Sequence, residues 1–101
     1  MNNTASDLGL EFALMQNQPN PFRPSTTLRF TLPSERDVRL EVFDVSGRMV
    51  KTLARGTFAP GMHTLQWNGI GEKGNRLPTG VYLYRLMAGK DVAKRKMILI
   101  D

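Results

Sequence analysis

The chain has 101 residues, no cysteine and a formal net charge of +5. The length suits one hydrophobic core, and 41% hydrophobic with 23% charged residues is the composition of a globular protein. Without cysteine the chain can form no disulfide, no cysteine metal site and no thiol nucleophile. No run reaches the roughly 20 apolar residues of a membrane-spanning helix, so we expect no transmembrane segment.

The N-terminal residues 1–13 are predicted to be a linker or an artificial tail. The polar start lacks the basic and apolar regions of a signal peptide and resembles an added start codon before a linker, as in a piece of a longer protein. Alternation of apolar residues over Leu8–Met15 predicts an extra strand as the alternative. Residues 14–101 are predicted to form the folded sorting or attachment domain.

A proline-rich lead follows this tail. In Pro19-Asn20-Pro21-Phe22 and the following Arg23-Pro24, the prolines fix φ and push the residues before them toward extended conformations. Phe22 between two prolines has little freedom to lose, so its burial costs little conformational entropy. We expect it to plug one end of the fold.

From Ser25 onward, short runs of β-branched, aromatic and aliphatic residues alternate with turn-forming residues at intervals of about ten residues. This rhythm is typical of β-sandwiches and barrels. We expect strands over 26–32, 37–44, 48–54, 62–68, 81–87 and 91–100. No helical periodicity is sustained in this part of the chain, so the predicted fold class is all-β, an immunoglobulin-like β-sandwich of about seven antiparallel strands.

Glycine-rich segments between these runs predict the turns. Gly47 is expected to supply a positive φ in a hairpin turn, 55–61 to form a loop whose Phe58 packs on the sandwich edge, and 69–75 to form a surface loop. A turn ending at Gly80 precedes the strongest strand.

Alternation within the strands predicts which side chains face the core. Val38, Leu40 and Val42 are expected to face inward, with Arg39 and Glu41 outward. In the fourth strand Trp67 shares a face with Leu65 and His63, and burial of this largest side chain in the core is predicted. Tyr82 and Tyr84 also share a face, and alternation leaves open whether that face is buried.

The chain offers few groups for catalysis, and we expect it not to be an enzyme. Its only histidine, His63, shares an apolar face and cannot build a triad or a zinc site alone. Five carboxylates fall at turns and strand ends, where they satisfy local backbone donors: Glu35, Asp37, Asp44, Glu72 and Asp91. No Asp-x-Asp spacing predicts calcium and no glycine loop fits a phosphate, so no cofactor and no metal are expected.

Basic residues are scattered along the chain except at Lys94-Arg95-Lys96, where alternation sends Arg95 to the opposite face from its neighbours. This distribution argues against nucleic acid as a partner. A sugar-binding surface is the rival hypothesis, because β-sandwiches bind glycans on rows of exposed aromatic side chains. The candidates for such a row are Trp67, Tyr82, Tyr84 and Phe43.

Short motifs occur in a fixed order from Leu14 to Ile100. They are Pro19-Asn20-Pro21-Phe22 before Ser25-Thr26-Thr27, Phe43-Asp44-Val45-Ser46-Gly47-Arg48, Pro60-Gly61-Met62-His63, Trp67-Asn68-Gly69, Pro78-Thr79-Gly80-Val81-Tyr82 and Lys96-Met97. In this order the chain resembles the immunoglobulin-like C-terminal sorting domains of type IX secretion. It equally resembles the related immunoglobulin-like domain of flagellar hook-capping proteins.

The resemblance implies a non-catalytic module that directs secretion and cell-surface attachment of a larger bacterial protein. Its implied partners are that cargo protein, the outer-membrane secretion and anchoring machinery, and surface lipopolysaccharide; its implied location is secreted or at the cell surface. The alternatives are a structural scaffold of the hook-capping kind and a carbohydrate-binding accessory module. The resemblance also implies recognition through the final strand, at Lys94, Lys96, Met97, Ile98, Leu99 and Ile100.

Two interpretations of that final strand remain open. As an edge strand it would expose unpaired backbone groups that a receptor can extend with a strand of its own. Alternatively, it closes its own sheet and its lysines are simply solvated.

Overall fold

The computed structural model describes residues 10–100, which form seven strands in two antiparallel sheets. Strands β1, β2 and β5 make a three-stranded sheet, and the four-stranded sheet has the order β4-β3-β6-β7. The strands are β1 (Ala13–Leu14), β2 (Thr26–Leu32), β3 (Arg36–Phe43), β4 (Met49–Phe58), β5 (Gly61–Trp67), β6 (Gly80–Ala88) and β7 (Asp91–Leu99). The predicted all-β fold is confirmed. The described residues include no helix long and apolar enough to cross a membrane.

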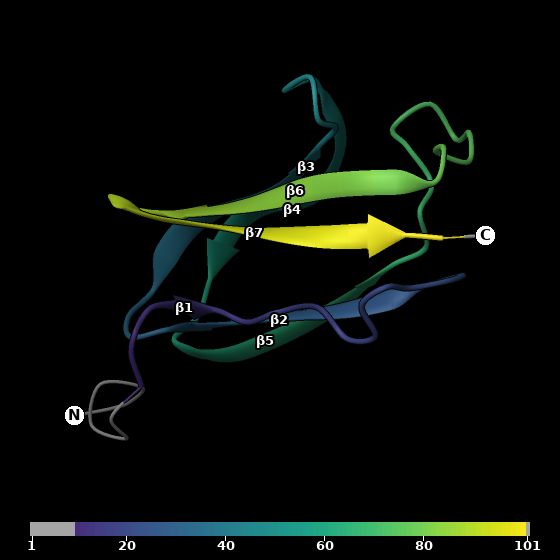
Figure 1. The fold of residues 1–101 in the computed structure, drawn as a ribbon. Helices are drawn as coiled ribbons and strands as arrows, with labels where there is room; N and C mark the ends of the chain where they lie inside the picture. The colour runs from purple at the N-terminus through teal and green to yellow at the C-terminus, as the bar shows by residue number, and fades with distance from the viewer. Residues whose placement is uncertain (1–9, 101) are drawn as a thin grey trace.

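The two sheets face each other across one hydrophobic core, with β2 and β5 in one layer and β6 and β7 in the other (Figure 1). Alternate residues of each strand point into this core, as period-two patterning requires. The largest fully buried side chains are Trp67, Tyr84, Phe22 and Phe30. The predicted burial of Trp67 and Phe22 is therefore confirmed, and the open question about the tyrosines is answered: both Tyr82 and Tyr84 are buried.

Strand β4 is longer than predicted. Residues 55–58 were expected to lie in a loop, but Arg55, Gly56, Thr57 and Phe58 pair with residues 36–39 of β3. Pairing along the whole length of β3 outweighs the local turn preference of Gly56, because each further pair satisfies backbone donors and acceptors. Phe58 packs edge-on against Phe30 of the facing sheet, with ring centroids 5.8 Å apart, as the sequence predicted.

Strand β1 is shorter than the alternative strand over Leu8–Met15. Only Ala13 and Leu14 form it within the described residues, and Leu8 lies outside them. The residues just before and just after β1 also lie beside β2. The Thr31 hydroxyl donates to the Glu11 carbonyl, and Met15 N–H donates to the Arg29 carbonyl. Beyond Met15 the chain leaves this sheet to reach the other one.

The turn between β3 and β4 has the predicted form. Gly47 has φ of +89°, a conformation that side chains with a Cβ rarely adopt. The Asp44 carboxylate accepts from the Ser46 hydroxyl at 2.6 Å and from the backbone N–H groups of Ser46 and Arg48. The Ser46 hydroxyl bond is the main cause that holds the pKa of Asp44 below its ordinary value of 3.8.

Glu41 lies on the outer face of the four-stranded sheet, as alternation predicted, but only 7% of the residue is exposed. The Arg85 guanidinium donates to it at 2.9 Å, and the Arg39 guanidinium lies 3.8 Å away. Guanidinium groups from β6 and from β3 itself therefore offset the charge of this carboxylate.

Candidate functional site

All the predicted recognition residues except Ile100 lie on β7, the edge strand of the four-stranded sheet. Strand β7 pairs with β6 without interruption from Asp91↔Ala88 to Leu99↔Gly80. Its other edge faces away from the sheet (Figure 1). The two halves of this free edge differ in structure.

Alternation splits the predicted residues between the core and the surface. Met97 and Leu99 are buried, with 0% and 3% of each residue exposed. Lys94 and Lys96 are exposed on the outer face, Ile98 is half-buried there, and Ile100 is exposed beyond the strand. Met97 and Leu99 therefore stabilise the core, whereas Lys94 and Lys96 are accessible at the surface.

The second half of the β7 edge is already covered by the proline-rich lead and by Gln16 just before it. Phe22 N–H donates to the Ile98 carbonyl at 2.9 Å, and Ile100 N–H donates to the Phe22 carbonyl at 3.0 Å. The Asn20 side chain accepts from Ile98 N–H, and the Gln16 side chain donates to the Lys96 carbonyl. Of the two interpretations left open, the open edge therefore does not hold for this half.

The first half of the edge is open. In an antiparallel ladder, successive residues point their backbone groups alternately toward and away from the partner strand. Since Ile98 and Ile100 point away from β6, Val92 and Lys94 do so too. Among residues 10–100, nothing bonds to the backbone N–H and C=O of Val92 and Lys94, or to the N–H of Lys96.

A buried polar network holds the lead in place. The Tyr84 hydroxyl donates to the Met15 carbonyl at 2.7 Å and accepts from Asn17 N–H at 2.8 Å. The Asn17 side chain donates to Thr26 and to the Pro19 carbonyl. Burial of the hydroxyl is the main cause that raises the pKa of Tyr84 above its ordinary value of 10.0. The network fixes the lead between the two sheets.

Arg95 reinforces this link from β7 itself. Its side chain lies on the opposite face from Lys94 and Lys96, as predicted, and its Nε donates to the Leu14 carbonyl at 2.6 Å. Both the lead and β1 are thus bonded to the last strand. Gln16 and Asn17 were not identified as anchors from the sequence, although the three polar amides of residues 16–18, directly before Pro19, were a usable signal.

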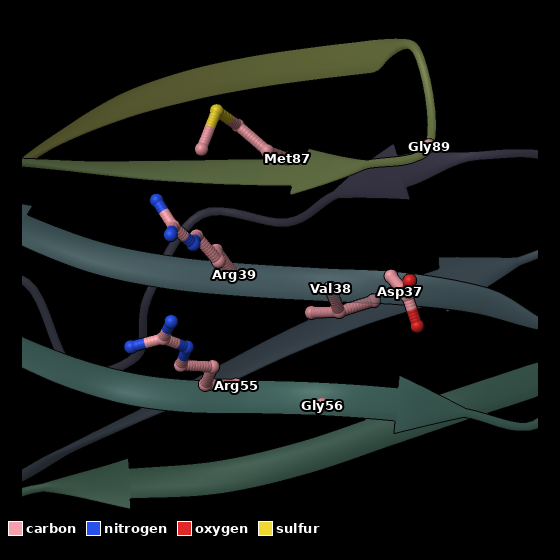
Figure 2. A pocket seen from close by; sticks show the side chains of 7 residues that line it. All are labelled: Asp37, Val38, Arg39, Arg55, Gly56, Met87 and Gly89. Atoms are coloured by element: carbon pink, nitrogen blue, oxygen red, sulfur yellow. The ribbon is translucent and has the colours of Figure 1, made fainter.

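The outer face of the four-stranded sheet is cationic. Arg39 and Arg55 are cross-strand partners, and Figure 2 shows both guanidinium groups on the same side of neighbouring strands. They lie beside a hollow of about 370 Å³ whose lining also includes Asp37 and Met87. The Asp37 carboxylate accepts from the Thr57 hydroxyl at 2.7 Å and does not pair with either arginine among the described contacts. Two arginine side chains from neighbouring strands thus border this hollow.

Further along this face, apolar and basic side chains lie together. The Arg85 guanidinium lies 4.7 Å from the centroid of the half-buried Phe43 ring. Leu83 pairs with Lys96, and Arg85 pairs with Lys94. The lysines of β7 thus border an apolar strip, and neither forms an ion pair within residues 10–100.

The aromatic side chains proposed for sugar binding do not form an exposed row. Trp67 and Tyr82 are 2% and 4% exposed, and Tyr84 is completely buried. The Trp67 indole donates to the Ile70 carbonyl, and the Tyr82 hydroxyl donates to the Pro78 carbonyl. None of the aromatic residues within residues 10–100 is exposed. The rival glycan-binding hypothesis therefore lacks its stacking surface in this structure.

His63 has the packing role that the sequence favoured. Its ring stacks on Phe30 at a centroid distance of 5.2 Å and meets Phe58 edge-on, while Nε2 bonds to the Ala59 carbonyl. The carboxylates of Asp44 and Glu72 accept backbone N–H groups, and that of Asp91 pairs with Arg36. Within the described part of the chain, no group of three or more histidine and acidic side chains is placed to hold a metal ion.

The remaining structural positions lie at the same end of the sandwich. Gly80 opens β6 opposite Leu99, with φ of +149°. Phe22 packs against Trp67, which in turn meets Tyr82 edge-on, with centroid distances of 5.7 and 6.0 Å. The residues Pro19, Asn20 and Pro21 lead into this cluster. The motif residues thus close one end of the core beside the last residues of β7.

Comparison with known proteins identifies relatives of this architecture. A family model for the FlgD Ig-like domain matches residues 22–91. A search of curated proteins finds no match.

Two solved structures share the fold. Dimeric latent PorU from Porphyromonas gingivalis is 24% identical with a TM-score of 0.72, and the match covers 86% of this chain and 9% of that one. PorZ, an essential bacterial surface component of the type-IX secretion system of the same organism, is 21% identical with a TM-score of 0.59, covering 96% of this chain and 12% of that one. The chain therefore spans about a tenth of each of these larger proteins.

Proposed function

Because the chain belongs to the FlgD Ig-like domain family, we propose that it is a non-catalytic module which directs secretion and surface attachment of a larger bacterial protein. The export and anchoring machinery of the outer membrane would recognise it, and surface lipopolysaccharide would be the attachment point. The proposed location is the outside of the cell, as part of the cargo.

The single observation that carries this proposal is the construction of β7. An edge strand whose first half has an open backbone edge, with two lysines that form no ion pair within residues 10–100, is suited to recognition by another protein. The fold likeness to PorZ, a surface component of type-IX secretion, supports the choice of machinery. The proposal also states that the module catalyses no reaction. The packing role of His63 supports this part.

A structural scaffold is the second candidate, because the matching family is named for the immunoglobulin-like domain of FlgD. A structural scaffold works through the surfaces of its sheets, at any position in a polypeptide. A sorting module must be read by the export machinery, so it should be able to export a protein that is foreign to it.

This difference defines the experiment. The chain is fused to the C-terminus of a periplasmic reporter in a bacterium with a type IX system, and surface display is measured by protease accessibility in intact cells. We expect display of the fusion and retention of the unfused reporter. A strain without the secretion system is the control, and retention of the folded fusion in both strains would refute sorting in favour of the scaffold.

A further inference from the structure

We propose that a partner docks on the first half of β7 by adding an acidic strand of about five residues along Val92–Lys96. This inference rests on the proposed function and narrows its site. Of the recognition residues that the resemblance implies, Lys94 and Lys96 lie on this docking edge, whereas residues 97–100 lie outside it.

The hydrogen bonds define the two limits of this docking edge. On one side, Gln16 bonds to the Lys96 carbonyl and the lead occupies Ile98 and Ile100, so an added strand cannot continue past Lys96 without displacing the lead. On the other side, β7 begins at Asp91, whose carboxylate pairs with Arg36 at 2.5 Å. Between these limits, the outward backbone groups of Val92 and Lys94 and the N–H of Lys96 have no partner within residues 10–100.

Charge selects the partner. Lys94 and Lys96 stand on the outer face next to this edge and have no carboxylate partner within residues 10–100. Arg85, the cross-strand neighbour of Lys94, adds a third cation whose charge is offset by Glu41. Lysines on an edge repel a second copy of the same strand, whereas alternate acidic residues of an added strand would face them.

The other sheet edges are less suited to strand addition. The β4 edge is broken by two register shifts, and Glu72 of the 69–75 loop bonds to Val50 and Thr52 on it. The β5 edge is regular, but its outward residues Met62, Thr64 and Gln66 are uncharged. Of the β4, β5 and β7 edges, that of β7 alone combines regular pairing with charge in the described part of the chain.

The test uses two proline variants of the reporter fusion. In Lys94→Pro the lost N–H points away from β6, so the internal ladder is kept while strand addition is blocked. Thr64→Pro is the matched control, because the Thr64 N–H likewise points away from its sheet on the β5 edge. We expect Lys94→Pro to reduce surface display about tenfold, because it removes roughly one backbone hydrogen bond to the partner. Thr64→Pro should leave display unchanged.

Charge variants test the same docking edge independently, in case a proline variant misfolds. Lys94→Glu with Lys96→Glu should also reduce display, whereas Lys94→Arg with Lys96→Arg should retain it, with melting temperatures near that of the parent chain. Normal display of Lys94→Pro, or equal losses in Lys94→Pro and Thr64→Pro, would overturn the docking edge while leaving sorting intact. Retention of the unmodified fusion would instead refute the proposed function itself.

Discussion

Deletion of residues 96–101 is expected to unfold the domain rather than to remove a recognition sequence alone. The deletion takes Met97 and Leu99 out of the core, where they are 0% and 3% exposed. Loss of such a buried side chain costs about 2–5 kcal/mol, so the two together approach the roughly 5–15 kcal/mol that stabilises a whole domain. The deletion also removes every backbone bond between β7 and Phe22.

Thermal unfolding followed by circular dichroism measures this effect. We expect the deleted chain to show no cooperative transition, whereas an Ile100→Ser variant, changed at an exposed residue, should melt close to the parent chain. A cooperative transition in the deleted chain would show that β7 contributes less to the core than its burial indicates. Failure of the deleted protein to be exported would therefore reveal nothing about recognition, which is why substitutions on the docking edge are preferable.

Replacement of Phe22 by alanine is expected to lower the free energy of unfolding by about 3–5 kcal/mol. Only 1% of Phe22 is exposed, and its ring packs 5.7 Å from that of Trp67. The substitution leaves a cavity beside the indole and weakens the contact of the lead with β7. Urea denaturation monitored by Trp67 fluorescence measures the loss.

Phe58→Ala is the matched control for this substitution. Phe58 is half-buried and lies against Phe30 and His63, far along the chain from the lead. Its replacement should cost less than that of Phe22. A loss for Phe22→Ala no larger than that for Phe58→Ala would mean that Phe22 contributes less to the core than its burial indicates.

Much of this fold could be predicted from the sequence, because its strands have clean two-residue periodicity. The inward positions of Val38, Leu40 and Val42 followed from alternation, and all three are buried. Phe22 was recognisable because prolines restrict the chain on both sides. Gly47 was recognisable because a tight hairpin turn requires a positive φ.

Features that depend on distant pairing were not predictable from local patterns. The strand character of residues 55–58 depends on the start of β3, and the burial of Glu41 depends on Arg85 from another strand. The partial covering of the β7 edge depends on bonds between residues about 80 positions apart, such as Gln16 with Lys96. The recognition roles of Lys94 and Lys96 stay predictions.

The central claim is that one strand has two roles, with its second half closed by the lead and its first half free for a partner. Amide hydrogen exchange in the isolated chain tests it most directly. The account predicts rapid exchange for the Val92, Lys94 and Lys96 amides and slow exchange for those of Ile98 and Ile100, which donate to Asn20 and Phe22. Equal protection of both groups, or rapid exchange at Ile98, would contradict it.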